Sequence, residues 1–117
     1  MQISSKNLSR STQSEIVDQL YTLLADLQTP SEVKSFLKDF LTETEQTVFS
    51  KRLAIAQLLS EGKSYKDIKA ELKVSSATIS SVAELIEKPG YSLAQNKIGL
   101  DQWAEKIVNR LPKFLRK

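Results

Sequence analysis

Residues 64–86 read SYKDIKAELKVSSATISSVAELI, and this stretch carries the signals of two short helices with a tight turn between them. Ser64 followed by Asp67 has the form of an N-cap with an acidic residue at the third helical position, which marks the start of the first helix. The apolar residues of this first helix then recur at helical spacing, at Tyr65, Ile68 and Leu72.

The second helix of the pair starts after Val74, where Ser75 and Ser76 interrupt the first apolar face and can cap a new helix. Its own apolar face consists of Ile79, Val82, Ala83 and Ile86. Two short helices joined by about four residues are typical of a helix-turn-helix, whose second helix enters the major groove of DNA. An ordinary helical hairpin inside a bundle is the alternative interpretation of the same pattern.

Composition excludes several classes of function. The 117-residue chain has no cysteine and no histidine, so disulfides, thiolate metal sites and imidazole acid–base chemistry are excluded. The serines between residues 75 and 81 have no histidine to activate them, so we expect no enzyme and no catalytic residue. The start of the chain lacks the apolar core of a signal peptide, and no run of about 18 apolar residues exists. We therefore expect a cytoplasmic protein with no membrane partner and no metal.

The charges are unevenly distributed along the chain. Residues 1–62 carry six Lys/Arg against eight Asp/Glu, whereas residues 63–117 carry eleven against six. The basic excess thus coincides with the predicted helix pair and everything after it, which is expected of a protein that binds phosphates. A lysine-rich solvated surface would give the same count.

Helical spacing of apolar residues extends to both sides of the pair and predicts an all-α chain of about six short helices. Residues 1–11 are predicted to form a mobile arm, and residues 12–117 a single helical domain. A first helix, starting near residues 11–14, carries an apolar stripe of Ile16, Val17, Leu20, Leu23, Leu24 and Leu27. A second helix, with Thr29 as N-cap, Pro30 at N1 and Glu32 at N3, is predicted to bury Val33, Phe36, Leu37 and Phe40.

The third helix follows Thr42 as a cap, and its segment 48–59, VFSKRLAIAQLL, is apolar over most of its circumference. A helix of this kind is buried on more than one side. Short helices in a small chain offer a thin core, so a second copy of the chain is the simplest cover, and we infer a homodimer. The alternative is that the terminal helices cover it within one chain. Gly62 is well placed as the left-handed residue that ends this helix.

After the helix pair, residues 87–92 form a cluster of helix breakers, and a polar stretch continues to Gly99. A last helix is predicted from Leu100 or Asp101 to Leu111, with Trp103 as a packing anchor. Residues 113–117, KFLRK, form a basic tail.

The predicted DNA contacts divide into two groups. Lys66 and Lys69 point away from the apolar face of the first helix and suit phosphate contacts that position the protein. Small side chains at the start of the second helix let it approach base edges: Ser75, Ser76, Ala77, Thr78, Ser80 and Ser81. Because no Arg, Asn or Gln lies in the first two turns, we expect modest affinity for each half-site and a steep dependence on salt.

With these residues in view, the chain resembles the Trp repressor superfamily. The resemblance rests on residues 41–86, with their LT-x-x-E start, their Lys51-Arg52 pair, the run IKAEL and the run ATIS, and on LDQW at residues 100–103. It implies an intertwined all-helical homodimer that represses transcription, each motif reading one half of a palindromic operator in double-stranded DNA. Positions that touch DNA in the family match Lys66, Lys69, Ala77, Thr78 and Ser80.

The resemblance also implies a ligand pocket, in which Thr42 and Arg52 match ligand-contacting residues. The second arginine of that pocket falls at Ser81, and the following small residues fall at Val82 and Leu85. Loss of a bidentate carboxylate partner is not conservative, so we do not expect tryptophan as co-repressor. Another small-molecule co-repressor stays open, and no cofactor is predicted.

Two other functions fit parts of the pattern. The motif also resembles the promoter-reading region of RNA polymerase sigma factors, which predicts a monomer bound to polymerase. The third possibility is a helical protein-interaction module whose motif does not bind DNA, which the missing arginine and Lys73 at the turn would favour.

Overall fold

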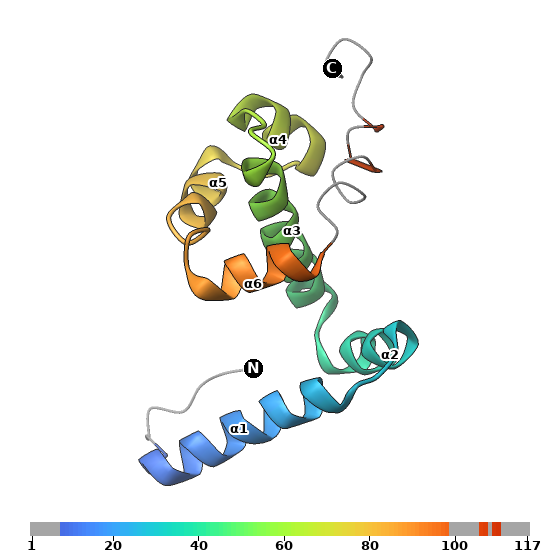
Figure 1. Cartoon of the computed structure of the whole chain (residues 1–117), viewed down its shortest axis with the longest axis vertical. Helices are drawn as coiled ribbons and strands as arrows, with labels where there is room; N and C mark the ends of the chain where they lie inside the picture. Colours follow the sequence, from blue (N-terminus) through green and yellow to red (C-terminus); the bar gives the residue numbers. More distant parts are fainter. Residues whose placement is uncertain (1–7, 99–105, 108, 111–117) are drawn as a thin grey trace. The chain divides into compact units, whose positions relative to one another are not determined.

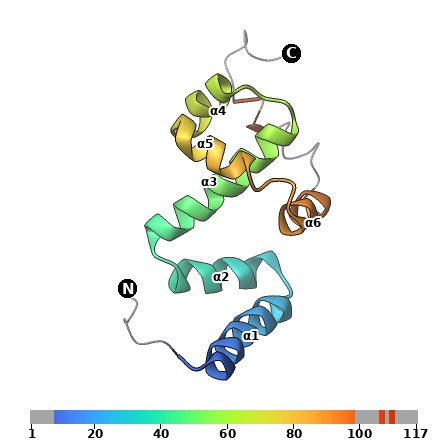
Figure 2. The same ribbon diagram turned by 90° about the vertical axis from the view of Figure 1, so that its left-hand side faces the viewer.

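The computed structural model describes residues 8–98, 106, 107, 109 and 110, and these residues form helices, turns and connecting segments without any strand (Figures 1 and 2). The helices in chain order are α1 (Arg10–Asp26), α2 (Pro30–Phe40), α3 (Glu43–Ser60), α4 (Tyr65–Leu72), α5 (Ser76–Ala83) and α6 (Pro89–Lys97). The all-α prediction is confirmed. The chain divides into two compact units, Met1–Glu43 and Thr44–Lys117, and the prediction of one domain over residues 12–117 stays a prediction.

The first unit holds α1 and α2, and both helices begin at side-chain caps. The Ser9 hydroxyl accepts a hydrogen bond of 3.2 Å from the backbone N–H of Thr12, so α1 begins slightly earlier than predicted. Thr29 caps α2 by accepting from the backbone N–H of Glu32 at 3.1 Å, and Pro30 occupies N1. The carboxylate of Glu32 in turn accepts from the backbone N–H of Gln28 at 2.8 Å. The predicted start of α2 is therefore confirmed in each part.

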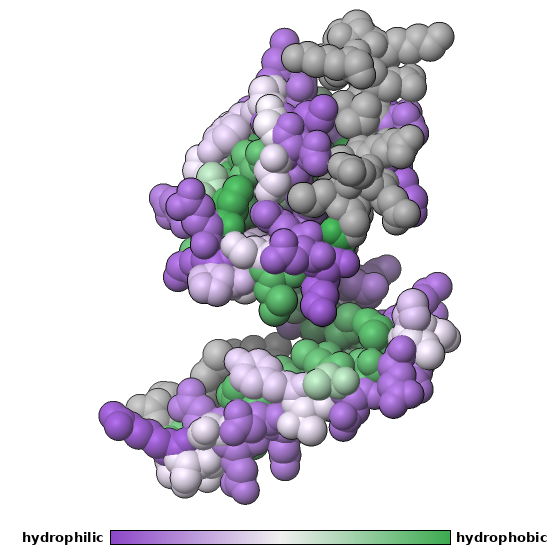
Figure 3. Space-filling model, viewed as in Figure 1, coloured by the Kyte–Doolittle hydropathy of each residue, from purple (hydrophilic) through white to green (hydrophobic). Residues whose placement is uncertain are grey.

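Neither α1 nor α2 has a buried residue, although the sequence predicts an apolar stripe on each. Tyr21 is 62% exposed and Phe40 is 59% exposed, although the Phe40 ring stacks on Phe36 at 4.7 Å between centroids. Figure 3 shows green, apolar side chains gathered on the surface of this unit. The predicted burial of Phe40 is thus wrong for a single chain, whereas Val33, Phe36 and Leu37 are half-buried.

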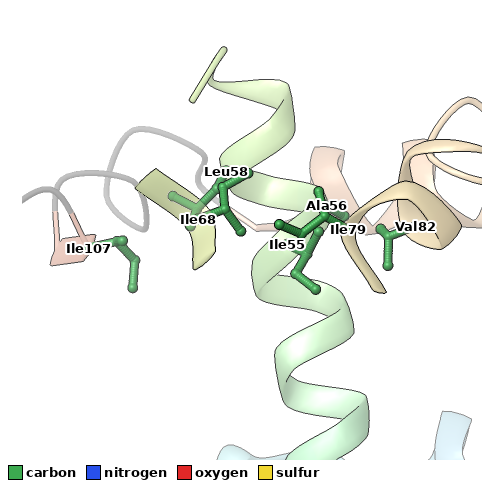
Figure 4. Packing of buried hydrophobic residues seen from close by; sticks show 7 residues of the cluster. All are labelled: Ile55, Ala56, Leu58, Ile68, Ile79, Val82 and Ile107. Carbon is green, nitrogen blue, oxygen red and sulfur yellow. The ribbon is translucent and has the colours of Figure 1, made fainter. Parts of the chain in front are cut away.

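The core lies in the second unit and is built around the C-terminal half of α3. Residues 54–58 are consecutive and all buried, so they cover the whole circumference of the helix, as predicted. Together with Ile107, apolar residues of α3, α4 and α5 form one cluster (Figure 4): Ile55, Ala56, Leu58, Ile68, Ile79, Val82 and Ile107. The N-terminal half of α3 differs, because Val48 and Phe49 are nearly half exposed.

The helix pair has the predicted helix-turn-helix form, and α4 and α5 pack beside the C-terminal half of α3 (Figures 1 and 2). Ser64 caps α4 by accepting a hydrogen bond from the backbone N–H of Asp67 at 3.1 Å. Gly62 and Lys73 both have left-handed backbone, with φ of 80° and 55°. α5 ends at Ala83, which is exposed, so the predicted apolar face is shorter and Ile86 follows the helix.

The region after the pair corrects one prediction. Residues 87–92 were expected to break helical structure, but α6 begins at Pro89. Proline lacks a backbone N–H that a helix would need only beyond its first turn, so it starts this helix at N1. The side-chain amide of Gln95 on α6 donates to the Ser60 hydroxyl at 2.7 Å, and this joins α6 to the end of α3.

Several predictions near the two ends of the chain lie outside the described residues. These are most of the arm at residues 1–11, the Trp103 anchor, the basic tail and most of the last helix. Within the predicted last helix, Lys106 and Ile107 are helical, and Ile107 belongs to the core.

We predict that Lys73→Gly stabilises the protein by about 0.5–1 kcal/mol. A lysine in left-handed backbone is strained by its Cβ, and glycine removes that strain at the cost of a more flexible unfolded chain. The midpoint of urea unfolding measures the change. A matched Lys88→Gly variant, at an extended position before α6, should not gain stability, and an equal gain there would contradict the explanation.

Candidate nucleic-acid interface

The eight predicted DNA contacts are all exposed, and they belong to α4, α5 and the residue that caps α5. In contrast, Ile68 of α4 and Ile79 and Val82 of α5 are buried in the core. The helical period therefore separates one face that holds the pair on α3 from another that is open to solvent. The open face carries Lys66, Lys69, Ser75, Ser76, Ala77, Thr78, Ser80 and Ser81.

Three hydroxyls at the start of α5 already form hydrogen bonds within the chain. Ser75 accepts from the backbone N–H of Thr78 at 3.1 Å, and the two hydroxyl oxygens lie 2.9 Å apart. The Ser81 hydroxyl donates to the carbonyl of Ala77 at 3.0 Å. These bonds fix the first turns of the helix and the direction of the side chains. Ser76 and Ser80 form no side-chain hydrogen bond with any described residue, so their hydroxyls are available to an incoming partner.

Lys66 and Lys69 lie on the solvent side of α4 and form no ion pair with the described part of the chain. Lys69 belongs to the last turn of α4, where its charge also complements the helix dipole. Their spacing of three residues places both side chains on one face, as the sequence predicts. Two exposed ammonium groups on the helix that packs against α5 suit contacts with phosphates.

A groove of about 430 Å³ adjoins this face within the second unit. It lies between α3, the turn and α5, and it is lined by Val48, Lys51, Arg52, Lys73, Val74, Ser75, Thr78, Ser81 and Val82. Arg52 and Ser81, which the sequence places in a ligand pocket, are thus brought to the same groove, whereas Thr42 belongs to the first unit and does not line it. Sequence reasoning did not assign Lys51 and Lys73 to a site.

The sequence comparisons agree with this geometry. The family model described as Trp repressor protein matches residues 15–96, which include the helix-turn-helix and most of the described helices. The chain belongs to the Trp repressor family. A curated relative, the uncharacterized protein YerC of Bacillus subtilis (strain 168), is 31% identical over 84 residues, which cover 70% of this chain and 81% of YerC. No solved structure matches the chain.

Membership of the Trp repressor family indicates a helix-turn-helix DNA-binding regulator rather than an enzyme. It confirms the resemblance that rests on residues 41–86. Within the described ranges, no helix is long and apolar enough to cross a membrane. The same described residues contain no group of three or more acidic side chains, histidines or cysteines that could hold a metal ion.

Proposed function

We propose that the protein is a sequence-specific, DNA-binding transcriptional repressor that acts in the cytoplasm as a homodimer. The observation that carries the proposal is the exposed start of α5, which is held on a buried core, together with the two exposed lysines of the adjoining helix α4. In a helix-turn-helix this is the part of the second helix that enters the major groove. A dimer presents two such helices to the two halves of a palindromic operator.

Recognition by this face combines two kinds of contact. Lys66 and Lys69 neutralise phosphates, which positions the protein without reading sequence. Ser76 and Ser80 offer free hydroxyls to base edges, and the methyl group of Ala77 suits contact with a thymine methyl group. Since bidentate arginine or glutamine contacts are missing from the first two turns of α5, phosphate contacts supply much of the affinity.

The homodimer is supported by apolar surface that a single chain leaves uncovered. Most large hydrophobic residues of α1 are at least 37% exposed, and Phe49 of α3 is similarly open. Isolated exposed apolar residues are common, but a helical stripe of them calls for a partner surface. A second copy supplies a matching stripe through twofold symmetry.

The test of DNA binding is the double change Lys66→Ala/Lys69→Ala. Log affinity falls with log salt, and each lost phosphate contact makes this slope less steep by about one unit. The slope of the variant should therefore be less steep by about two units for each bound subunit. Gel retardation with fragments selected from random DNA, repeated over a range of salt concentrations, measures this slope.

Lys34→Ala/Lys38→Ala is the matched control, because it removes the same charge from two exposed lysines of α2. Its slope should equal that of the unaltered protein. If the unaltered protein retards no duplex even at low salt, the DNA-binding function is refuted.

A further inference from the structure

Among the residues that the structure describes, the groove beside α5 is lined by three cationic side chains and by no carboxylate. Lys51 and Arg52 come from α3, and Lys73 comes from the turn between α4 and α5. The other described lining residues are hydroxyl-bearing or apolar, so none of them offsets the positive charge. Clefts with charge of one sign attract counter-ions strongly, because the surrounding protein focuses the field.

Two contacts orient the side chains of Lys51 and Arg52. The Nζ atom of Lys51 lies 3.5 Å from the carbonyl oxygen of Lys73, within reach of a long hydrogen bond across the groove. The guanidinium carbon of Arg52 lies 5.6 Å from the centroid of the Phe49 ring, in a cation–π contact. Neither contact neutralises the charge. The start of α5 also borders the groove at Ser75 and Thr78, and the positive end of a helix dipole favours an anion there.

The charge pattern selects among anions. A free amino acid would bring an ammonium group into a groove whose described lining has three cations and no carboxylate, so its own positive charge would be opposed. An anion without an ammonium group meets no such repulsion, and two negative charges would be attracted more strongly than one. Lysines and arginine are also the side chains that commonly bind phosphate.

We propose that this groove binds a phosphate group. Val48, Val74 and Val82 give it an apolar wall, and its volume of about 430 Å³ is that of a small-molecule site. An organic phosphate therefore fits with its apolar part against the valines and its phosphate between Lys51 and Lys73. A phosphate of the DNA backbone has the same chemistry and is the other source. The site goes beyond the proposed function, and its ligand chemistry holds with or without DNA reading.

The experiment titrates the full-length protein, free of DNA, with phenyl phosphate and with L-phenylalanine, which share a phenyl ring and differ in charge. Calorimetry gives the affinities, and amide NMR shifts show whether the groove is occupied. Phenyl phosphate should bind at least tenfold more tightly than phenylalanine. Lys51→Ala/Lys73→Gly should weaken the binding of phenyl phosphate tenfold or more. Glycine is chosen at position 73 because it keeps the left-handed turn intact.

Lys88→Ala/Lys97→Ala removes two exposed lysines from the same unit and serves as the control, with unchanged phosphate binding expected. Circular dichroism verifies that both variants fold. A second arm tests DNA retardation at low salt. One outcome is that phenyl phosphate fails to bind while the groove variant, unlike the control variant, loses DNA retardation. In that case the DNA backbone is the source of the phosphate.

Three outcomes overturn the proposal. The first is that phenylalanine binds as tightly as phenyl phosphate. The second is that phenyl phosphate binds equally well to the groove variant. The third is that phenyl phosphate does not bind and the groove variant shows no loss of DNA binding. If the protein binds phenyl phosphate in the groove and retards no DNA, the proposed function fails while the phosphate site stands.

Discussion

Ile55→Ala is expected to destabilise the protein by about 2–5 kcal/mol, which is the usual range for truncation of a fully buried isoleucine. Ile55 is 0% exposed and lies at the centre of the cluster that joins α3 to α4 and α5. A small domain has a total stability of about 5–15 kcal/mol, so this single change removes a large share of it. Urea unfolding followed by circular dichroism, at one fixed protein concentration, measures the loss.

Leu93→Ala on α6 is the matched control for this prediction. Leu93 is 58% exposed, so its truncation should change stability by no more than about 0.5 kcal/mol. Equal unfolding midpoints for Ile55→Ala and the unaltered protein would show that this cluster is not the core.

Leu24→Glu is expected to convert the proposed dimer into monomers. Leu24 is 41% exposed in the single chain and belongs to the apolar stripe of α1, which we propose to be covered by the second copy. Burial of an unpaired carboxylate costs on the order of several kcal/mol. A small interface that loses this much binding free energy no longer holds two chains together. Light scattering coupled to size-exclusion chromatography reads the mass directly.

Gln19→Glu adds the same charge to α1 outside the apolar stripe, and this variant should remain dimeric. A monomeric mass for the unaltered protein at micromolar concentration would refute the homodimer. It would instead favour a monomeric module of the kind that resembles promoter-reading regions of sigma factors.

Local signals in the sequence predicted most of the helix starts and turns correctly. Ser64, Thr29 and Ser75 cap α4, α2 and α5 with the hydrogen bonds that their spacing indicates. Gly62 has the left-handed backbone predicted for the residue that ends α3. Such features depend on residues within four positions of one another, and for that reason sequence alone reveals them.

Features that depend on distant parts of the chain were less predictable. Pro89 looks like a breaker in the sequence, but the same residue suits the first turn of a helix, and α6 begins there. The stripes on α1 and α2 predict burial, but no residue of either helix is buried in the single chain, because a pattern does not say which molecule provides the cover. The groove is a third case, because Lys51 and Lys73 are 22 positions apart and meet only when the turn packs on α3.

The hydrogen-bonded hydroxyls of α5 also affect the entropy of DNA recognition. The side chains at positions 76, 77 and 80 are short, with one χ1 torsion in each serine and none in the alanine. Hydrogen bonds within the chain already order three further hydroxyls, those of Ser75, Thr78 and Ser81. A reading helix built on arginines would lose up to about 2 kcal/mol of rotamer freedom for each side chain that it orders. In the DNA complex that we propose, the side chains of this helix therefore lose little rotamer freedom when α5 enters the major groove. We expect weak individual contacts whose free energy is reduced little by side-chain ordering.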